Sequence, residues 1–266
     1  MKRYLLVLLF LAVLFGCKKQ ETDPETGEPE VAASVKIEAG TVADHDLIVA
    51  TPCNAGSSVV ILLAETTDVK AAVAVPSVNK KVTEQCLLGG YTLCIVGISS
   101  SDNPDFIKEI KIEFPNASKF YLLGYLKGGS LAYAAAMKYP GEFKAFGSVN
   151  GPIDYATYSK TDFTVPVNFI HVHGTANTVY MWNGKDKEYA GAALSVGAAV
   201  AAAKCVHYET GSYLARDGYE KVTYTHYIGS SHGKDVMFYQ VPGGKNDWCD
   251  SNFEVYNAIW QFFNKH

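Results

Sequence analysis

Residues 119–151 read KFYLLGYLKGGSLAYAAAMKYPGEFKAFGSVNG, and this stretch is the strongest indication of the fold. The apolar run 119–125 is typical of a buried strand, and the two glycines that follow shortly after it allow a sharp turn. The alanine-rich segment 128–138 has the composition of a helix, and it stops at Tyr-Pro-Gly before a second apolar run at 144–150. The stretch therefore predicts a strand, a tight turn, a helix and a second strand.

The same alternation of apolar runs and helical segments continues on both sides of this stretch. Several runs, such as VVILLA and YTLCIVG, are apolar throughout, which is typical of strands that are covered on both faces. Strands that alternate with helices predict an α/β fold: a mostly parallel central sheet with helices on both faces, in a single domain. The predicted strands are 46–51, 58–64, 91–97, 119–125, 144–150, 166–173, 221–228 and 235–241. The predicted helices are 104–114, 128–138, 190–204 and 253–264.

Composition excludes several classes of protein. The chain has 266 residues, of which 48% are hydrophobic and 19% charged, and its formal net charge is -4. A chain so rich in apolar residues is not disordered. Its net negative charge gives no electrostatic attraction to phosphates, so we expect no nucleic-acid partner. Only one stretch is long and apolar enough to enter a bilayer, which excludes a polytopic membrane protein.

The N-terminus is typical of a bacterial export signal. A basic segment at residues 1–3 precedes an apolar run, and the sequence LFGC that ends at Cys17 resembles a lipoprotein box. We therefore expect residues 1–16 to be a lipoprotein signal peptide and Cys17 to carry the lipid that anchors the protein to the cell envelope, on its periplasmic or surface face. An ordinary signal peptide or membrane anchor is the alternative. Residues 17–45 are predicted to be a flexible tether that leads to a domain at 46–266.

Five cysteines remain beyond the lipidated one. They are Cys53, Cys86, Cys94, Cys205 and Cys249. An exported protein keeps disulfides, but an odd number leaves at least one thiol unpaired, and the pairing is open. Cys94 lies in an apolar strand and is predicted to be buried. No two cysteines have the spacing of metal ligands, and the sequence predicts neither a metal nor a cofactor.

The turn at Gly124-Tyr125-Leu126-Lys127-Gly128 resembles the nucleophile elbow of the α/β hydrolases, in which G-x-S-x-G turns a strand into a helix and presents a serine. The closest resemblance is to the polyhydroxybutyrate depolymerase and feruloyl esterase branch. It covers roughly residues 46–266 and implies an α/β-hydrolase fold. The further segments that carry it, in order, are DLIVATPCNAGSSVVILLAE, VNFIHVHGTANTVYMWNG, VMFYQVPGGKNDW and AIWQFFNKH. They resemble the strands before the oxyanion loop, the acid turn, the histidine turn and the closing helix.

The positions that this resemblance assigns to catalysis are replaced. The nucleophile position is Leu126, which has no heteroatom to attack a carbonyl. The acid position is Asn177 and the base position is Asn246, and neither amide titrates near neutral pH. The oxyanion loop has Ala64 and Glu65 where the family has His-Gly, and a carboxylate there would repel the developing oxyanion. We therefore expect an esterase-like domain that has lost its catalytic machinery.

Two other groups of residues have alternative interpretations. Ser130 also stands in a Gly-x-Ser setting and His232 lies in a polar loop, so a displaced serine hydrolase is one alternative; the other is that Ser130 packs the helix against the sheet. His171 and His173 share one face of a predicted strand, which suits either zinc binding or hydrogen-bonded structural histidines. We favour the structural interpretation for both groups.

Aromatic side chains surround the predicted crevice at the carboxyl ends of the strands. The candidate ligand-binding residues are Tyr125, Lys127, Tyr180, Trp182 and Trp248. Aromatic faces beside polar groups suit a carbohydrate or an aromatic ester, although large aromatic residues equally often anchor loops. Three functions therefore remain open. The favoured one is an envelope-tethered protein that binds glycans or plant-polymer fragments; the others are a displaced hydrolase and a protein–protein role in an envelope assembly.

Overall fold

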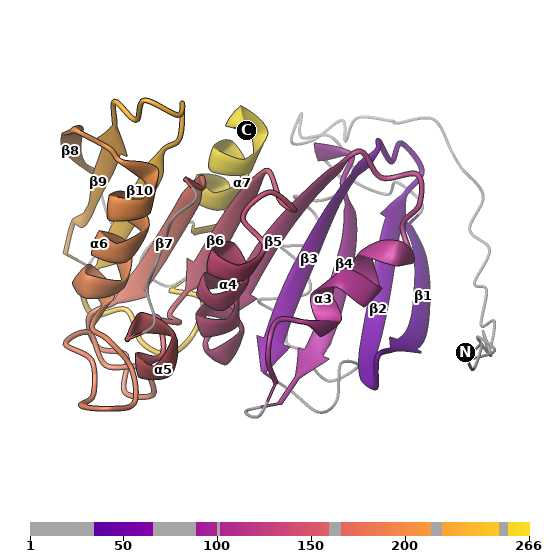
Figure 1. Ribbon diagram of the computed structural model, residues 1–266, viewed down its shortest axis with the longest axis horizontal. Coiled ribbons are helices and arrows are strands. Elements are labelled where there is room, and N and C mark those ends of the chain that lie inside the picture. The colour runs from indigo at the N-terminus through magenta and orange to yellow at the C-terminus, as the bar shows by residue number, and fades with distance from the viewer. Residues whose placement is uncertain (1–34, 66–88, 100–101, 160–165, 214–219, 250–254) are drawn as a thin grey trace, which may run out of the picture.

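The computed structural model describes residues 35–65, 89–99, 102–159, 166–213, 220–249 and 255–266 (Figure 1). In this part of the chain ten strands form one sheet, in the order β1-β2-β4-β3-β5-β6-β7-β10-β9-β8. Their bounds are β1 Val35–Val42, β2 His45–Pro52, β3 Ser58–Glu65, β4 Thr92–Ile98, β5 Lys119–Tyr125, β6 Ala145–Val149, β7 Phe169–Gly174, β8 His207–Tyr213, β9 Val222–Ile228 and β10 Val236–Val241. The six central strands, from β4 to β10, are parallel, and an antiparallel pair flanks them on each side.

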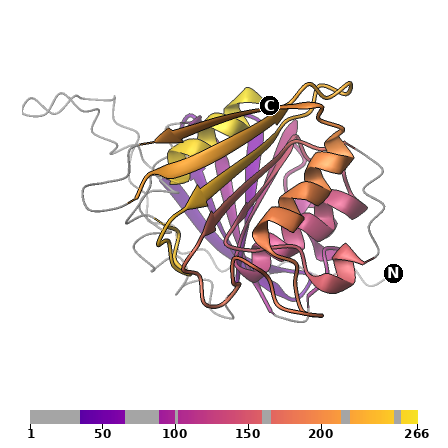
Figure 2. The ribbon, with the colours of Figure 1, turned by 90° about the vertical axis from the view of Figure 1, so that its left-hand side faces the viewer.

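Helices cover both faces of this sheet (Figures 1 and 2). They are α3 Phe106–Ile112, α4 Lys127–Lys138, α5 Tyr155–Tyr158, α6 Ala192–Ala203 and α7 Val255–Lys265. One hydrophobic cluster joins residues of α3, α4 and α6 to one face, and a second joins α7 to the other. The predicted fold class, a mostly parallel sheet between helices in one domain, is confirmed.

Strand β3 shows why the central runs are apolar without interruption. Successive side chains of a strand point to opposite faces, and both faces are covered here. Ile61 belongs to the core under α3, α4 and α6, whereas Leu62 belongs to the core under α7, and both are fully buried. Cys94 on the neighbouring strand is also fully buried, as predicted, and burial raises the pKa of its thiol to about 12. From residue 59 to residue 64 of β3 and along all of β4 the side chains are buried, which accounts for the apolar character of these runs.

The predicted elements all occur, within about three residues at each end, but the strands β1 and β8 and the short helix α5 were missed. Strand β1 lies inside residues 17–45, and all eight of its residues pair with β2. The predicted domain start at residue 46 is therefore too late. Both missed strands are mostly exposed edge strands without a continuous apolar run, which is the signal the prediction relied on.

The predicted signal peptide and Cys17 lie outside the described residues, and so does Cys86. Among the helices that the structure describes, none combines the length and the apolar character that a membrane span requires.

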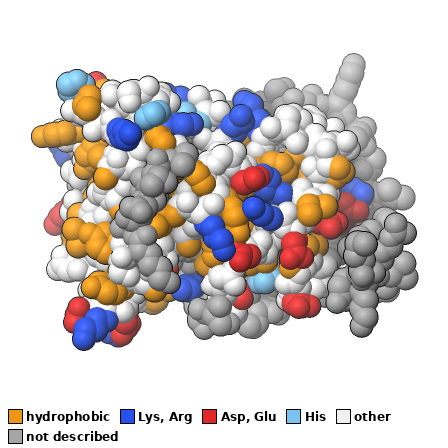
Figure 3. Space-filling model, in the orientation of Figure 1, with side chains coloured by type: hydrophobic (Ala, Val, Ile, Leu, Met, Phe, Trp, Pro, Cys, Tyr) orange, Lys and Arg blue, Asp and Glu red, His pale blue; other side chains and the backbone are white. Residues whose placement is uncertain are grey.

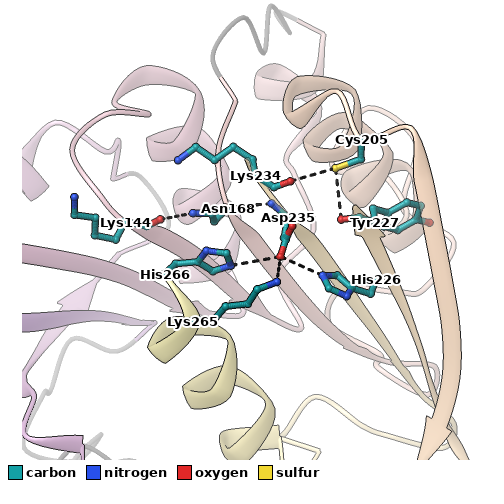
Figure 4. Close-up of polar contacts among 9 residues, drawn as sticks. All are labelled: Lys144, Asn168, Cys205, His226, Tyr227, Lys234, Asp235, Lys265 and His266. Carbon is teal, nitrogen blue, oxygen red and sulfur yellow. Dashed lines mark hydrogen bonds and ion pairs between the residues drawn. The ribbon is translucent and has the colours of Figure 1, made fainter. Parts of the chain in front are cut away.

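Asp235 joins β10, β9 and α7 at the amino-terminal edge of the parallel strands (Figure 4). Its carboxylate forms an ion pair with Lys265 and lies 3.3 Å from His226 Nε2 and 3.8 Å from His266 Nε2. Its backbone N–H donates to Asn168 Oδ1 at 3.1 Å. Partial burial would raise the pKa of Asp235, but Lys265 and His226 together outweigh burial and lower it. The carboxylate therefore stays ionised and fixes the C-terminal helix to the sheet.

The opposite edge, at the carboxyl ends of the parallel strands, depends on very close backbone approaches. A Cβ atom on Gly124 would lie 1.9 Å from the carbonyl oxygen of Gly128, and a Cβ on Gly128 would lie 2.2 Å from that of Leu63. Helix α4 therefore starts in direct backbone contact with β3 and β5, and only glycine fits at both positions.

We expect Gly124→Ala to destabilise the protein by at least about 2 kcal/mol, because the new methyl group can only be accommodated by moving backbone. Gly197→Ala is the matched control, since a Cβ there meets nothing within 4 Å on the exposed side of α6. Alanine at that helical position should be neutral or stabilising by up to about 1 kcal/mol. The measurement is the free energy of unfolding in denaturant, and equal effects of the two substitutions would contradict the prediction.

Candidate functional site

Leu126 forms the sharp turn between β5 and α4. Its backbone has φ 51° and ψ -118°, a strained conformation for a residue other than glycine. Two hydrogen bonds hold it there: its N–H donates to Val149 O at 2.9 Å, and its carbonyl accepts from the N–H of Gly129 at 2.9 Å. The structure thus places a half-buried leucine at the tip of the turn, with the geometry of an elbow but without a nucleophile.

Asn177, at the predicted acid position, uses its side chain to hold the loop after β7. It is buried, and its Oδ1 accepts hydrogen bonds from the N–H groups of Val179 and Tyr180, both at 2.9 Å. Its Nδ2 donates to Asn150 O at 3.4 Å. The oxygen and the nitrogen of the amide therefore both form hydrogen bonds with backbone groups, and neither bonds to a histidine.

Asn246, at the predicted base position, is exposed in the turn after β10. Its contact with the elbow is made by its backbone, because its carbonyl accepts a hydrogen bond of 2.5 Å from Tyr125 Oη. The turn at Leu126 and the turn after β10 are thus neighbours in space, as the resemblance implies. The contact between them uses the Tyr125 hydroxyl and the backbone of Asn246, and not the Asn246 side chain.

Asn150, at the end of β6, is the residue of this edge that the sequence analysis missed. It is fully buried with φ 58°. Its Nδ2 donates to Lys245 O at 2.9 Å and to Asp247 O at 2.5 Å, while its Oδ1 accepts from Gly174 N–H at 2.9 Å. One amide therefore ties together the loops after β6, β7 and β10. The Asn-Gly pair that ends an apolar run was the available signal, since asparagine tolerates a positive φ at such turns.

Two of the predicted ligand-binding aromatic residues pack against other rings of the protein. Trp248 is 2% exposed and lies between the rings of Tyr125 and Tyr256, at centroid distances of 4.8 and 5.5 Å. This burial contradicts its predicted role as a ligand contact: the ring packs in the core under α7. Trp182 stacks on Phe238 at 5.6 Å and packs against the opposite core, so it too anchors a loop.

The remaining candidates are partly accessible. Tyr180 is half-buried with its ring edge against Tyr189 at 5.1 Å, and Tyr125 and Lys127 flank the elbow, also half-buried. Tyr125 is tied by its hydroxyl to the histidine turn and by its ring to Trp248. Of the five predicted residues, Tyr125 and Trp248 are in contact with each other, at the turn after β5 and the turn after β10.

The oxyanion segment is described only in part. Ala64 is buried near the end of β3, where it pairs with Gly97 on β4 and Tyr125 on β5. Glu65 pairs with Ile98 at the last position of the strand. The segment that follows, 66–88, lies outside the described residues, so the predicted effect of the Glu65 carboxylate on an oxyanion stays a prediction.

His171 and His173 form a buried hydrogen-bonded chain. Tyr133 Oη lies 2.9 Å from His171 Nδ1, His171 Nε2 lies 3.1 Å from His173 Nδ1, and His173 Nε2 lies 2.8 Å from Tyr180 O. Because a carbonyl only accepts, His173 must donate from Nε2, so His171 donates from Nε2 and Tyr133 donates its hydroxyl. Every nitrogen then has its role fixed with both rings neutral, and the described residues contain no cluster of three or more metal-binding side chains.

Burial keeps both rings neutral. It lowers the pKa of His173 to about 4 and that of His171 well below its usual value, with His173 adding to the effect on His171. The pair therefore has the structural role that the sequence analysis favoured, and it fixes the position of the loop that carries Tyr180.

The displaced-serine alternative lacks its geometry. Ser130 is 1% exposed, and its Oγ donates to Pro152 O at 2.6 Å. His232 precedes β10 and so lies at the opposite edge of the sheet, a strand length of about 20 Å away. At this separation the two residues cannot form a catalytic pair.

A second grouping of serine, carboxylate and histidine lies beside β4. Ser99 Oγ donates to Asp102 Oδ1 at 2.9 Å, and His45 Nε2 lies 3.0 Å from Asp102 Oδ2. The carboxylate therefore stands between serine and histidine, whereas a triad needs the histidine in the middle. This grouping borders a cavity of about 680 Å³ between the β1–β2 turn and α3, whose wall includes Asp44, Asp105 and Glu109. Figure 3 shows charged side chains gathered over this side of the molecule.

Comparison with known proteins extends these observations. No family model and no curated protein matches the sequence. Solved structures do match: a CIB-like hydrolase of Thermoplasma acidophilum has a TM-score of 0.56 and 10% identity over 88% of this chain and 100% of its own. The acetyl xylan esterase of Aspergillus awamori has 0.56 and 11%, over 86% and 99%. Est1E of Butyrivibrio proteoclasticus has 0.53 and 11%, over 86% and 98%.

This is the α/β-hydrolase fold. The parallel sheet, the turn at Leu126 and the structural matches agree on it. Identities near 10% show the fold alone and do not distinguish one branch of α/β hydrolases from another.

We expect the stability of this domain to fall as the pH drops from about 6.5 to 4. In the unfolded chain His173 binds a proton below about 6.5, whereas in the folded protein its pKa is about 4. Because the unfolded state then binds more protons, acidification favours it, by about 3 kcal/mol for this residue once the pH reaches 4.

The measurement is the free energy of unfolding in denaturant between pH 7.5 and 4.5. His173→Gln keeps a donor and an acceptor and should flatten the pH dependence. His232→Gln, at an exposed position, is the control and should leave the curve unchanged. Identical curves for the wild type and His173→Gln would show that this histidine does not carry the effect.

We expect Asn150→Ala to cost about 2–4 kcal/mol, because it leaves buried backbone groups of three loops without their partner and places alanine at a positive φ. Asn183→Ala, on the exposed loop after β7, should change stability by less than about 0.5 kcal/mol. Thermal and denaturant unfolding of the two variants provide the comparison. A small effect at position 150 would show that the three loops hold together without it.

Proposed function

We propose that this protein is a non-hydrolytic α/β-hydrolase-fold lipoprotein of the bacterial cell envelope, which acts by binding a partner. The observation that carries the proposal is Leu126 at the strained turn. An elbow exists to present one nucleophilic atom at the carboxyl edge of the sheet, and a leucine side chain supplies none.

The surrounding polar groups support this proposal because each has a structural use. Asn177 holds its own loop, and Asn246 meets the elbow through backbone. Ser130, the nearest hydroxyl in the helix, is buried against a carbonyl. Neutral amides neither accept a proton from a nucleophile nor stabilise an imidazolium, so hydrolysis has no base and no acid at these positions.

The partner that we favour is another protein in an envelope assembly. A glycan or aromatic-ester ligand would need accessible rings, yet Trp248 is buried and Trp182 packs on Phe238. The resemblance to polyhydroxybutyrate depolymerases and feruloyl esterases then concerns ancestry rather than a retained ligand site. The LFGC sequence ending at Cys17 supports attachment to the membrane through lipid, which keeps such a protein at the envelope.

We expect the mature protein to show no hydrolysis of short-chain aryl esters above background, and Leu126→Ser alone to leave it inactive. A serine hydroxyl is a weak nucleophile until a neighbouring base takes its proton, and triad members act as a unit. The triple variant Leu126→Ser, Asn177→Asp, Asn246→His supplies all three groups and should exceed the single variant. The measurement is release of the chromogenic alcohol, with folding checked by circular dichroism.

Ser130→Ala is the matched control and should leave any background rate unchanged, since its hydroxyl is buried. Wild-type turnover that Ser130→Ala abolishes would establish the displaced hydrolase instead. A single Leu126→Ser variant as fast as the triple would reveal a base elsewhere, and the non-hydrolytic proposal would be wrong.

A further inference from the structure

Strand β8 forms one end of the sheet and leaves one edge without a strand partner among the described residues. Its seven residues pair with β9 over their whole length, from His207 opposite Ile228 to Tyr213 opposite Val222. Figure 2 shows it as the outermost strand on its side of the molecule. No described strand pairs with its outer edge, and an edge of this kind is where a further strand can add to a sheet.

This edge lacks the devices that usually prevent strand pairing. Its sequence, HYETGSY, contains no lysine, arginine or proline, and the register with β9 runs without a bulge. Its one carboxylate is that of Glu209. The edge strand at the other end of the sheet, β1, differs because it carries Lys36 and Glu38, which form an ion pair of 2.7 Å.

Apolar side chains are exposed on and beside the same strand. Val206 is 70% exposed, Tyr208 67% and Tyr213 42%. Figure 3 shows hydrophobic side chains along the end of the molecule that carries β8 and α6. A strand that adds to this edge would cover part of that surface as well as the backbone.

We propose that the partner of this edge is β8 of a second copy of the same protein, paired antiparallel about a two-fold axis through Thr210. A two-fold axis perpendicular to the sheet leaves each side chain on the same face of the sheet in both copies. Side chains of directly opposed residues share a face, so the two residue numbers must differ by an even number. Centring the pair on Thr210 satisfies this condition and uses all seven residues of the strand.

The charges and sizes of the side chains favour this register. Thr210 then lies opposite Thr210 of the second copy, a favourable pair, and Tyr208 lies opposite Ser212. Glu209 lies opposite Gly211, whose lack of a side chain is required because the Tyr224 ring lies over it. A register centred on Glu209 would instead oppose two carboxylates, and one centred on Gly211 would pair only five residues of β8. The strand is therefore self-complementary in one register, which is why we favour a second copy over another partner.

This inference is independent of whether the domain hydrolyses esters. Lipid anchoring, where it holds, would confine copies to one membrane and raise their local concentration. The test is co-purification of two differently tagged full-length copies extracted in mild detergent. We expect wild-type copies to co-purify, and Thr210→Lys in both copies to reduce recovery at least tenfold, because two ammonium groups would then face each other.

A charge swap tests the register. One copy with Thr210→Lys and the other with Thr210→Glu should recover co-purification, whereas Thr210→Glu in both copies should not. Ser212→Lys adds the same charge to the same face of β8 but opposes Tyr208, so it should retain association. Circular dichroism checks that every variant is folded. Absent wild-type association, an equal loss for Thr210→Lys and Ser212→Lys, or failure of the swap to restore recovery would each overturn the proposal.

Discussion

The close backbone contact between β5, β3 and the start of α4 is the constraint on which the rest of the molecule depends. Gly124 and Gly128 have no side chain because carbonyl oxygens occupy the places where a Cβ would lie. This contact forces the chain into the strained turn at Leu126 and directs α4 along the sheet. A strained turn of this kind is often found at functional sites, and in this protein it holds a leucine, which fits the non-hydrolytic function that we propose.

The carboxyl edge of the sheet is held by amides and aromatic rings. Asn150 bonds to backbone of the loops after β7 and β10, and Asn177 fixes the first of these loops from within. Trp248 fills the space between the elbow and α7. In an active hydrolase these loops carry groups that must exchange protons, whereas neutral amides hold one fixed arrangement of hydrogen bonds. The described part of this edge is held by hydrogen bonds from amides to backbone and by stacked rings.

Burial lowers the pKa values of histidines in two different surroundings. His171 and His173 are buried among neutral partners, and burial is the main cause of their lowered pKa values. His266 lies beside Asp235, but burial and the charge of Lys265 outweigh the attraction of that carboxylate and lower its pKa to about 4. Both sets are therefore neutral near pH 7, and both favour unfolding when the solution becomes acidic.

From sequence alone, the central strands and the sharp turn at Leu126 were predictable, and so was the presence of a leucine at that turn. Those features depend on local signals: unbroken apolar runs, glycines at fixed spacing, and the identity of one residue in a motif. The sequence did not reveal β1 and β8, because an exposed edge strand needs no apolar face and is held by the backbone of its neighbour.

The contacts between side chains follow from the tertiary structure and could not be predicted from local sequence patterns. The sequence placed Trp182 and Trp248 beside a crevice, but whether a ring faces solvent depends on the elements packed against it, and here these are Phe238, Tyr125 and Tyr256. The role of Asn150 was hidden for the same reason, since its partners Gly174, Lys245 and Asp247 are distant in sequence. Local pattern fixes what a segment forms, whereas burial and hydrogen-bond partners arise from contacts between segments far apart in the chain.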